Sequence, residues 1–205
     1  MANSATFYPS GAVEGDIDEA VLRRLVHEVG GTLGNVYGKR GKALLLHRLN
    51  GFNNAARFHP WIVLADLDND WQCAPLAMTA WLPRPARSMV FRIAVREVEA
   101  WILADRQRVA QFLGVADSRV PLHPETLDDP KAALVNVARR SRRKDVKLDL
   151  VPRPGSDAPV GAAYTSRLIE FVSDARIGWR PRVAAAHSNS LRHCLERLQE
   201  LKART

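Results

Sequence analysis

The sequence predicts an α/β protein with a mainly parallel sheet flanked by helices and a helical C-terminal extension. The continuous apolar segment at 61–65 is typical of a strand buried on both faces of a parallel sheet. Strand and helix patterns alternate around it, which indicates parallel strands joined by right-handed crossovers. No strand pattern follows Gly114. We therefore expect a core over residues 1–115, with a mainly helical extension over residues 116–205 packed on it.

The first half of the core begins with a weak strand pattern at 11–13, where a glycine and a nearby proline disfavour strand structure. A clear helix follows, with acidic residues in its first turn and the glycine pair at 30–31 at its end. Its apolar residues recur every fourth position, at Ile17, Val21, Leu25 and Val29. The next predicted elements are a strand at 35–37, a basic turn at 38–42, and a helix at 43–49 that extends toward residue 57.

The second half of the core contains the strand at 61–65 and a helix at 73–81, which ends before two prolines. A strand at 89–95 then leads into a single long helix at 97–113. In the extension, Asp129 and Pro130 are typical of the first positions of a helix. Two more helices are predicted at 164–172 and 191–201, the last with Ser190 as its candidate N-cap.

The composition is ordinary for a globular protein, with 46% apolar and 25% charged residues. No apolar run reaches 18 residues, so we expect no membrane span. Residues 1–6 lack the basic start and apolar segment of a secretory signal. Cys73 and Cys194 lie far apart, which favours reduced thiols and a cytoplasmic location over a disulfide framework.

The net charge of +8 favours an anionic partner, and nucleic acid is the first candidate. A basic run provides the clearest phosphate-binding surface, and its members are Arg139, Arg140, Arg142, Arg143, Lys144 and Lys147. A second basic group in the turn at 38–42 consists of Lys39, Arg40 and Lys42. The alternative interpretation of the long run is a solvated helix face.

Carboxylates follow several of the predicted strands. Asp66, Asp68 and Asp70 end the segment at 61–65, Glu14 follows the first strand, and Glu97 follows the last. Ligands of open α/β sheets bind at this edge, and crowded carboxylates need a cation or a proton. A hard divalent metal such as Mg²⁺ takes oxygen ligands. The alternatives are a solvated strand end for the aspartates, a dipole-stabilised carboxylate for Glu14, and an ion pair for Glu97 with Arg92 or Arg96.

Three other acidic residues near these positions are not expected to be ligands. Glu99 lies one helical turn beyond the last strand, and we expect it to point away from the site. Asp18 and Asp105 are expected to be structural residues or to support the ligands.

The segment 13–22, with Glu14-Gly15 before an amphipathic helix, resembles the first motif of the TOPRIM domain, and Asp66-Leu67-Asp68 resembles its second. The segments 92–105 and 164–201 are similar to an uncharacterised bacterial TOPRIM-like family often found beside phage-defence genes. The resemblance implies a Rossmann-like TOPRIM fold, with Asp66 and Asp68 as ligands of Mg²⁺ (or Mn²⁺). It also implies that Glu14 is a ligand or general acid/base, and that Asp70 or Glu97 holds a second metal.

The predicted function is therefore Mg²⁺-dependent hydrolysis of phosphodiester bonds in nucleic acid, in a phage-defence setting, by Glu14, Asp66, Asp68 and Glu97. The alternative is a non-catalytic TOPRIM-like module that binds nucleic acid or a protein partner from a defence system. A nucleotide phosphotransferase lacks a phosphate-binding glycine loop beyond residues 38–41. An EF-hand is excluded, because Trp71 and Ala77 occupy the positions of its glycine and glutamate. A haloacid dehalogenase-type phosphatase fits poorly, because its Asp-x-Asp normally follows the first strand.

Overall fold

A parallel sheet of four strands forms the centre of the fold. The computed structural model describes residues 7–205. Its strands have the order β2-β1-β3-β4, and every neighbouring pair is parallel. They are β1 (Ser10–Val13), β2 (Val36–Gly38), β3 (Trp61–Asp66) and β4 (Met89–Ala94). The predicted α/β class with a parallel sheet is confirmed.

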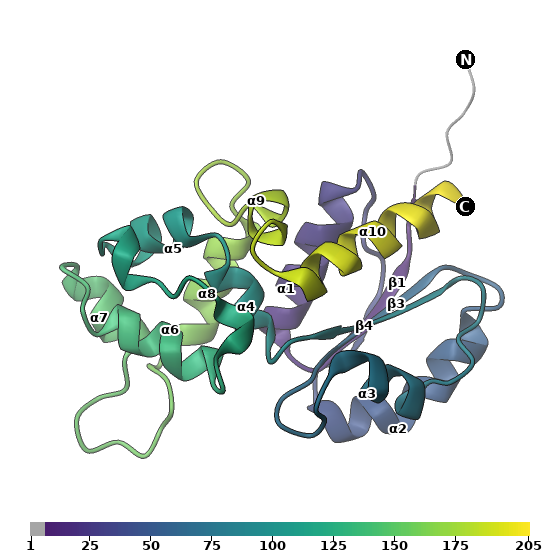
Figure 1. Ribbon diagram of the computed structural model, residues 1–205, viewed down its shortest axis with the longest axis horizontal. Helices are drawn as coiled ribbons and strands as arrows, with labels where there is room; N and C mark the ends of the chain where they lie inside the picture. Colours follow the sequence, from purple (N-terminus) through teal and green to yellow (C-terminus); the bar gives the residue numbers. More distant parts are fainter. Residues whose placement is uncertain (1–6) are drawn as a thin grey trace.

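Helices cover both faces of this sheet (Figure 1). One face packs against α1 (Asp16–Glu28) and α10 (Asn189–Ala203), and the other packs against α2 (Lys42–Ala55) and α3 (Ala74–Trp81). Successive strand residues point to opposite faces. Ile62 and Leu64 of β3 therefore contribute to the first core, while Val63 and Ala65 contribute to the second. Coverage of both faces explains why β3 is apolar without alternation.

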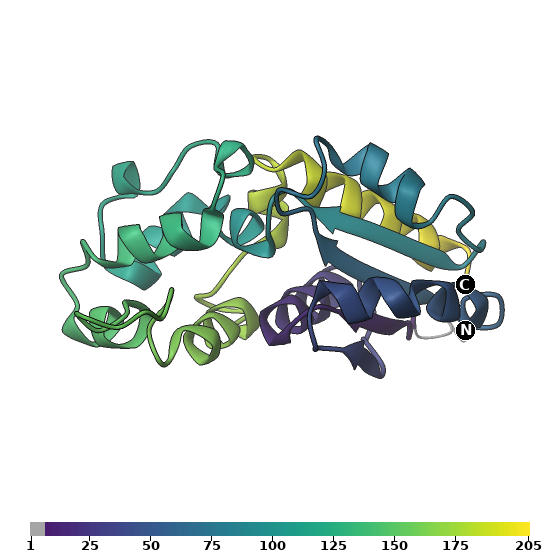
Figure 2. The ribbon, with the colours of Figure 1, turned by 90° about the horizontal axis from the view of Figure 1, so that it is seen from below.

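The remaining helices lie beyond the carboxyl ends of the strands, on the left in Figure 1 and Figure 2. They belong to the same hydrophobic core as α1, because Leu134, Tyr164 and Trp179 are buried in it together with Leu22 and Ile62. These elements are α4 (Val98–Leu103), α5 (Arg106–Leu113), η1 (Asp117–Arg119), η2 (Pro124–Thr126), α6 (Pro130–Ala138), α7 (Lys144–Leu150), α8 (Tyr164–Ser173) and α9 (Pro181–Ala185).

The structure differs from the prediction in the segment 97–113, where two helices replace the expected single helix. The buried Asp105 begins α5 and accepts a hydrogen bond from the Arg108 N–H. It also binds the guanidinium of Arg180 at 2.7 and 2.9 Å. An aspartate side chain that is fixed by a residue outside the helix favours an N-cap, and hence a new helix start, over continuation of the preceding helix. The prediction of one helix was wrong because Arg180, which holds this cap, is 75 residues away in the chain.

The predicted N-cap of the last helix was also wrong. Ser188, and not Ser190, accepts the hydrogen bond from the Leu191 N–H. The Ser190 hydroxyl instead donates to Glu125 and accepts from the Trp101 indole N–H. The short helices α7 and α9 were not predicted, since helices of this length carry too little periodicity.

Two expectations from the sequence concern a membrane span and a secretory signal. Among residues 7–205, no helix has the length and apolarity that crossing a bilayer requires. The expectation of no secretory signal falls on residues 1–6, which lie outside the described residues.

Candidate functional site

The carboxyl edge of the sheet brings Glu14 and Asp66 together. Each follows or ends a strand, and β1 and β3 are direct neighbours. The Glu14 carboxylate accepts a hydrogen bond of 2.8 Å from the Asp66 N–H. Burial raises the pKa of Glu14, and this effect exceeds the opposing effects of that hydrogen bond and of Lys42. The Glu-Gly and Asp-x-Asp motifs therefore meet at one point in the fold.

Asp66 faces the side of the sheet that α1 covers, because it lies two and four residues after Leu64 and Ile62. Its Oδ1 accepts a hydrogen bond of 3.0 Å from the Val98 N–H, at the start of α4. Burial raises the pKa of Asp66 well above its ordinary value, and the charges of Asp18, Glu99 and Glu14 raise it further. The charged form of Asp66 is therefore disfavoured both by its limited contact with water and by the neighbouring carboxylates.

Asp18 lies in the first turn of α1, four residues after Glu14 in the chain, and only 6% of its surface is exposed. Its Oδ1 is buried and has no hydrogen-bond partner among residues 7–205. Burial raises its pKa to about 7, with further contributions from Glu99 and Glu14. Gly15 is close by, and a Cβ at that position would lie 3.1 Å from Asp18 Oδ2. The glycine of the Glu-Gly motif thus leaves room for the Asp18 carboxylate.

Glu99 completes this group, contrary to the expectation that it points away. It is 2% exposed, and its Oε1 accepts a hydrogen bond of 3.2 Å from the Tyr164 hydroxyl. Burial raises the pKa of Glu99. Together with Asp18 and Asp66 it lines a cavity of about 400 Å³, which Lys131 and Tyr164 also line. We call Asp18, Asp66 and Glu99 the acidic cluster.

The other predicted carboxylates are engaged by lysines. Asp68 forms an ion pair with Lys42, whose Nζ also lies 2.8 Å from Asp70. Glu97 accepts a hydrogen bond of 3.1 Å from the Lys131 N–H and pairs with Lys131 Nζ at 3.2 Å. Glu97 is thus bound to Lys131, and neither Arg92 nor Arg96 pairs with it among the described residues. These three carboxylates are paired with lysines. Within the acidic cluster, Glu99 lies 3.7 Å from Lys131 Nζ, while Asp18 and Asp66 form no ion pair among residues 7–205.

The predicted basic residues divide into paired and free groups. Lys39 pairs with Asp16 and Glu19, at 3.4 and 2.8 Å. Lys42 pairs with Asp68 and Asp70. Arg40 is exposed. All six basic side chains of the run at 139–147 are exposed. Within residues 7–205, Arg143 is the member of that run with an ion pair, at 2.6 Å from Asp145. The run spans the end of α6 and the start of α7.

Sequence reasoning missed Asp18, Glu99, Lys131 and Tyr164 as parts of this site. Asp18 had a signal, because it lies in the first turn of the helix that begins directly after the strand end at Glu14. Glu99 lies near Asp66 because its neighbour in the chain, Val98, donates a backbone hydrogen bond to the Asp66 carboxylate. Lys131 and Tyr164 come from distant elements and had no local signal.

The carboxylate oxygens of the acidic cluster suit a hard cation, although these side chains are not arranged as a complete set of metal ligands. Within the described residues, no three His, Cys, Asp or Glu side chains are arranged as metal ligands. The acidic cluster nevertheless has a buried carboxylate oxygen without a partner, and carboxylate oxygens are the ligands that Mg²⁺ and Mn²⁺ prefer. The residues therefore fit a divalent metal by their chemistry.

Comparisons of the chain with protein-family models, with curated proteins and with solved structures gave no match.

Proposed function

We propose that this chain is a metal-dependent nuclease with a TOPRIM-like core, and that the acidic cluster is the centre of its metal site. The observation that carries the proposal is the buried Asp18 oxygen without a partner among residues 7–205, in the cavity that Asp66 and Glu99 also line. Carboxylates in such surroundings hold protons, or they hold a cation. A cavity open to solvent at the carboxyl edge of a parallel sheet is where α/β proteins bind their ligands.

A bound Mg²⁺ or Mn²⁺ would neutralise charge on a phosphodiester and lower the pKa of a coordinated water. In this assignment Asp18, Asp66 and Glu99 hold the metal. The Tyr164 hydroxyl and the Val98 N–H orient Glu99 and Asp66 through their hydrogen bonds. Lys131 supplies a positive charge for a phosphate at the cavity wall. Glu14, with its raised pKa, supplies a proton-accepting or proton-holding group beside Asp66.

The metal ligands predicted from the sequence, which are Glu14, Asp66, Asp68 and Asp70, share only Asp66 with the acidic cluster. The two sets make different predictions, because Lys42 already compensates Asp68 and Asp70. If the acidic cluster binds the metal, Asp66→Asn and Asp18→Asn should each weaken Mn²⁺ or Mg²⁺ binding by about tenfold or more. Asp68→Asn should have a smaller effect.

The test is metal titration by calorimetry together with cleavage of single- and double-stranded DNA and RNA. The matched control is Asp117→Asn, an exposed aspartate on η1 that should leave both measurements unchanged. Equal metal uptake by wild type and Asp66→Asn would refute the site. A stronger loss for Asp68→Asn than for Asp18→Asn would favour the set from the TOPRIM resemblance.

The alternative is a non-catalytic module that binds nucleic acid or a protein of a defence system. The pairing of Asp68, Asp70 and Glu97 with lysines favours it, since those carboxylates need no metal. Wild-type protein that neither takes up metal nor cleaves any of the four substrates would support this alternative. The phage-defence setting and the cytoplasmic location are proposed from the sequence alone.

A further inference from the structure

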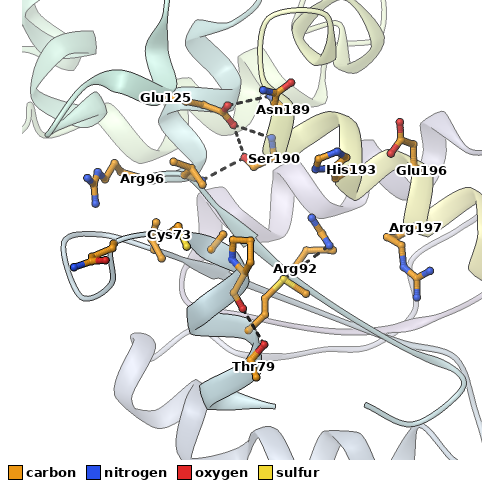
Figure 3. Close-up of a pocket in the computed structure, with 16 residues that line it drawn as sticks. Cys73, Thr79, Arg92, Arg96, Glu125, Asn189, Ser190, His193, Glu196 and Arg197 are labelled. Atoms are coloured by element: carbon orange, nitrogen blue, oxygen red, sulfur yellow. Dashed lines mark hydrogen bonds between the residues drawn. The ribbon is translucent and has the colours of Figure 1, made fainter. Parts of the chain in front are cut away.

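A second cavity, of about 760 Å³, lies between α3, β4 and α10 (Figure 3). It shares no lining residue with the cavity of the acidic cluster. β4 is an edge strand, so α3 and α10 extend past the sheet and leave a space beside it. The walls include the apolar side chains of Leu67, Pro75 and Met78, and charged side chains from β4 and α10. Its size and mixed lining are those of a site for a small organic molecule.

Arg92 is the unusual residue of this cavity. It lies in the middle of β4, on the sheet face that α1 and α10 cover, where its neighbours Val90 and Ala94 are core residues. Its Nε is buried without a hydrogen-bond partner among residues 7–205, and its one side-chain hydrogen bond there, of 3.9 Å, goes to the sulfur of Met78. A guanidinium carries five N–H donors and always a charge, so this arrangement costs free energy. Burial lowers the pKa of Arg92 for the same reason.

The carboxylates of the cavity are occupied by other groups. Glu125 accepts hydrogen bonds from the Ser188 and Ser190 hydroxyls and from two backbone N–H groups, as Figure 3 shows for Ser190 and Asn189. Glu196 pairs with Arg192 at 3.4 Å. Neither glutamate forms an ion pair with Arg92 among residues 7–205.

Two other arginines line the cavity. Arg96 donates to the Asp68 carbonyl at 2.8 Å, and Arg197 pairs with Glu200. With Arg92, the lining has three arginines and two glutamates. The cavity is thus an apolar-walled space with more arginines than glutamates, and its Arg92 forms no ion pair among the described residues.

We propose that this cavity binds a nucleoside monophosphate, with the phosphate on Arg92. The planar guanidinium fork matches a phosphate with two parallel hydrogen bonds. An inorganic ion would leave the walls of Leu67, Pro75 and Met78 uncovered, whereas a base and sugar would cover them. Gln72, Asn189 and His193 line the same space and offer polar groups for a base or sugar. The inference does not depend on the acidic cluster or on any catalysis.

The test is calorimetric titration of the full chain with four nucleoside 5′-monophosphates, their nucleosides and inorganic phosphate. At least one monophosphate should bind about tenfold or more tightly than both its nucleoside and inorganic phosphate. Equal binding of inorganic phosphate, or no binding of any monophosphate, would overturn the proposal. Arg92→Met should weaken binding by about tenfold or more. Arg57→Met, at an exposed arginine beyond the end of α2, should not change it.

A second pair of variants keeps Arg92 in place and covers the case in which Arg92→Met does not fold. Met78→Glu puts a carboxylate next to the guanidinium, at the position of the sulfur that Arg92 contacts, and should compete with the phosphate. Met78→Gln changes the same wall without adding a charge, so it should bind the monophosphate more tightly than Met78→Glu. Loss of binding in Met78→Glu alone supports an anion on Arg92, and equal binding by both variants refutes it.

Discussion

At the scale of single residues, the acidic cluster has few hydrogen-bond donors and counter-ions for its three carboxylates. Asp18 and Asp66 form no ion pair among residues 7–205, and Glu99 shares Lys131 with Glu97, which lies closer to it, while Asp68 and Asp70 both pair with Lys42. Removal of water raises the pKa of Asp18, Asp66 and Glu99, because the charged form loses hydration without gaining a sufficient counter-ion. The cluster is therefore a source of instability unless a proton or a cation is bound.

This has a consequence for the pH dependence of stability without metal. The pKa of Asp18 is about 7 in the folded chain, against 3.8 without the surroundings of the fold. The folded state thus binds the proton more tightly, and this stabilising effect is lost as the pH rises from about 4 to about 7. Asp18→Asn should gain about 2–4 kcal/mol in free energy of unfolding, relative to wild type, between pH 4 and pH 8.

Urea denaturation in the presence of a chelator, at several pH values, measures this effect. Asp117→Asn serves as the control, because that exposed side chain has no hydrogen bond or ion pair within residues 7–205. A difference between Asp18→Asn and wild type that stays constant with pH would mean that the Asp18 carboxylate is not strained in the folded chain.

At the scale of elements, the link between β2 and α2 depends on a glycine with a left-handed backbone. Gly38 has φ +91°, and a Cβ at this position would lie 2.2 Å from the carbonyl oxygen of Val13. That oxygen accepts a hydrogen bond of 2.9 Å from the Lys39 N–H, which continues the pairing of β1 with β2. The turn delivers Lys42, which pairs with Asp68, to the carboxyl edge of the sheet.

Gly38→Ala should therefore destabilise the chain by about 3 kcal/mol or more, since both backbone strain and a clash with β1 oppose it. Gly51→Ala is the matched change in the same region. Gly51 lies within α2, and a Cβ there would meet no atom within 4 Å, so alanine should stabilise the helix by about 0.5–1 kcal/mol. Thermal denaturation of both variants compares the two outcomes. Similar melting temperatures would show that the turn tolerates a side chain.

At the scale of the whole molecule, α6 joins the acidic cluster to the basic run. Lys131 is near the start of this helix, beside Glu99, and Arg139 follows its end. Eight residues of helix separate them by about 12 Å. A nucleic-acid backbone lying along α6 would therefore contact exposed arginines and reach the cavity of the acidic cluster.

The basic run supplies a prediction for nucleic-acid binding. The variant carrying Arg139→Gln, Arg140→Gln and Arg142→Gln loses three exposed cations that have no ion pair within residues 7–205. Its affinity for duplex DNA should fall for every sequence, and the log–log salt slope should decrease by about 0.9 for each lost phosphate contact. Fluorescence anisotropy at several salt concentrations measures both.

The matched control changes Arg57, Arg84 and Arg87 together to glutamine, which removes the same charge from exposed positions elsewhere on the surface. Equal slopes in the two variants would leave the basic run as a solvated helix surface.

The sequence by itself determined the periodic parts of this protein. The apolar run of β3, the stripes of α1 and α10, and the cap formed by Asp129 and Pro130 are local patterns, because burial and capping repeat within a few residues. The meeting of Glu14 and Asp66 also follows, since parallel strands bring their carboxyl ends to one edge.

Only the tertiary structure decided which charges are paired. The break at Asp105 depends on Arg180, the pairing of Asp68 on Lys42, and the surroundings of Glu99 on Lys131 and Tyr164. The exposed or buried state of a carboxylate, and hence its pKa, depends on such partners and not on its neighbours in the chain. For this reason the sequence located the edge of the sheet that carries the candidate site, while the tertiary structure placed Asp18, Asp66 and Glu99 there with fewer counter-ions than carboxylates.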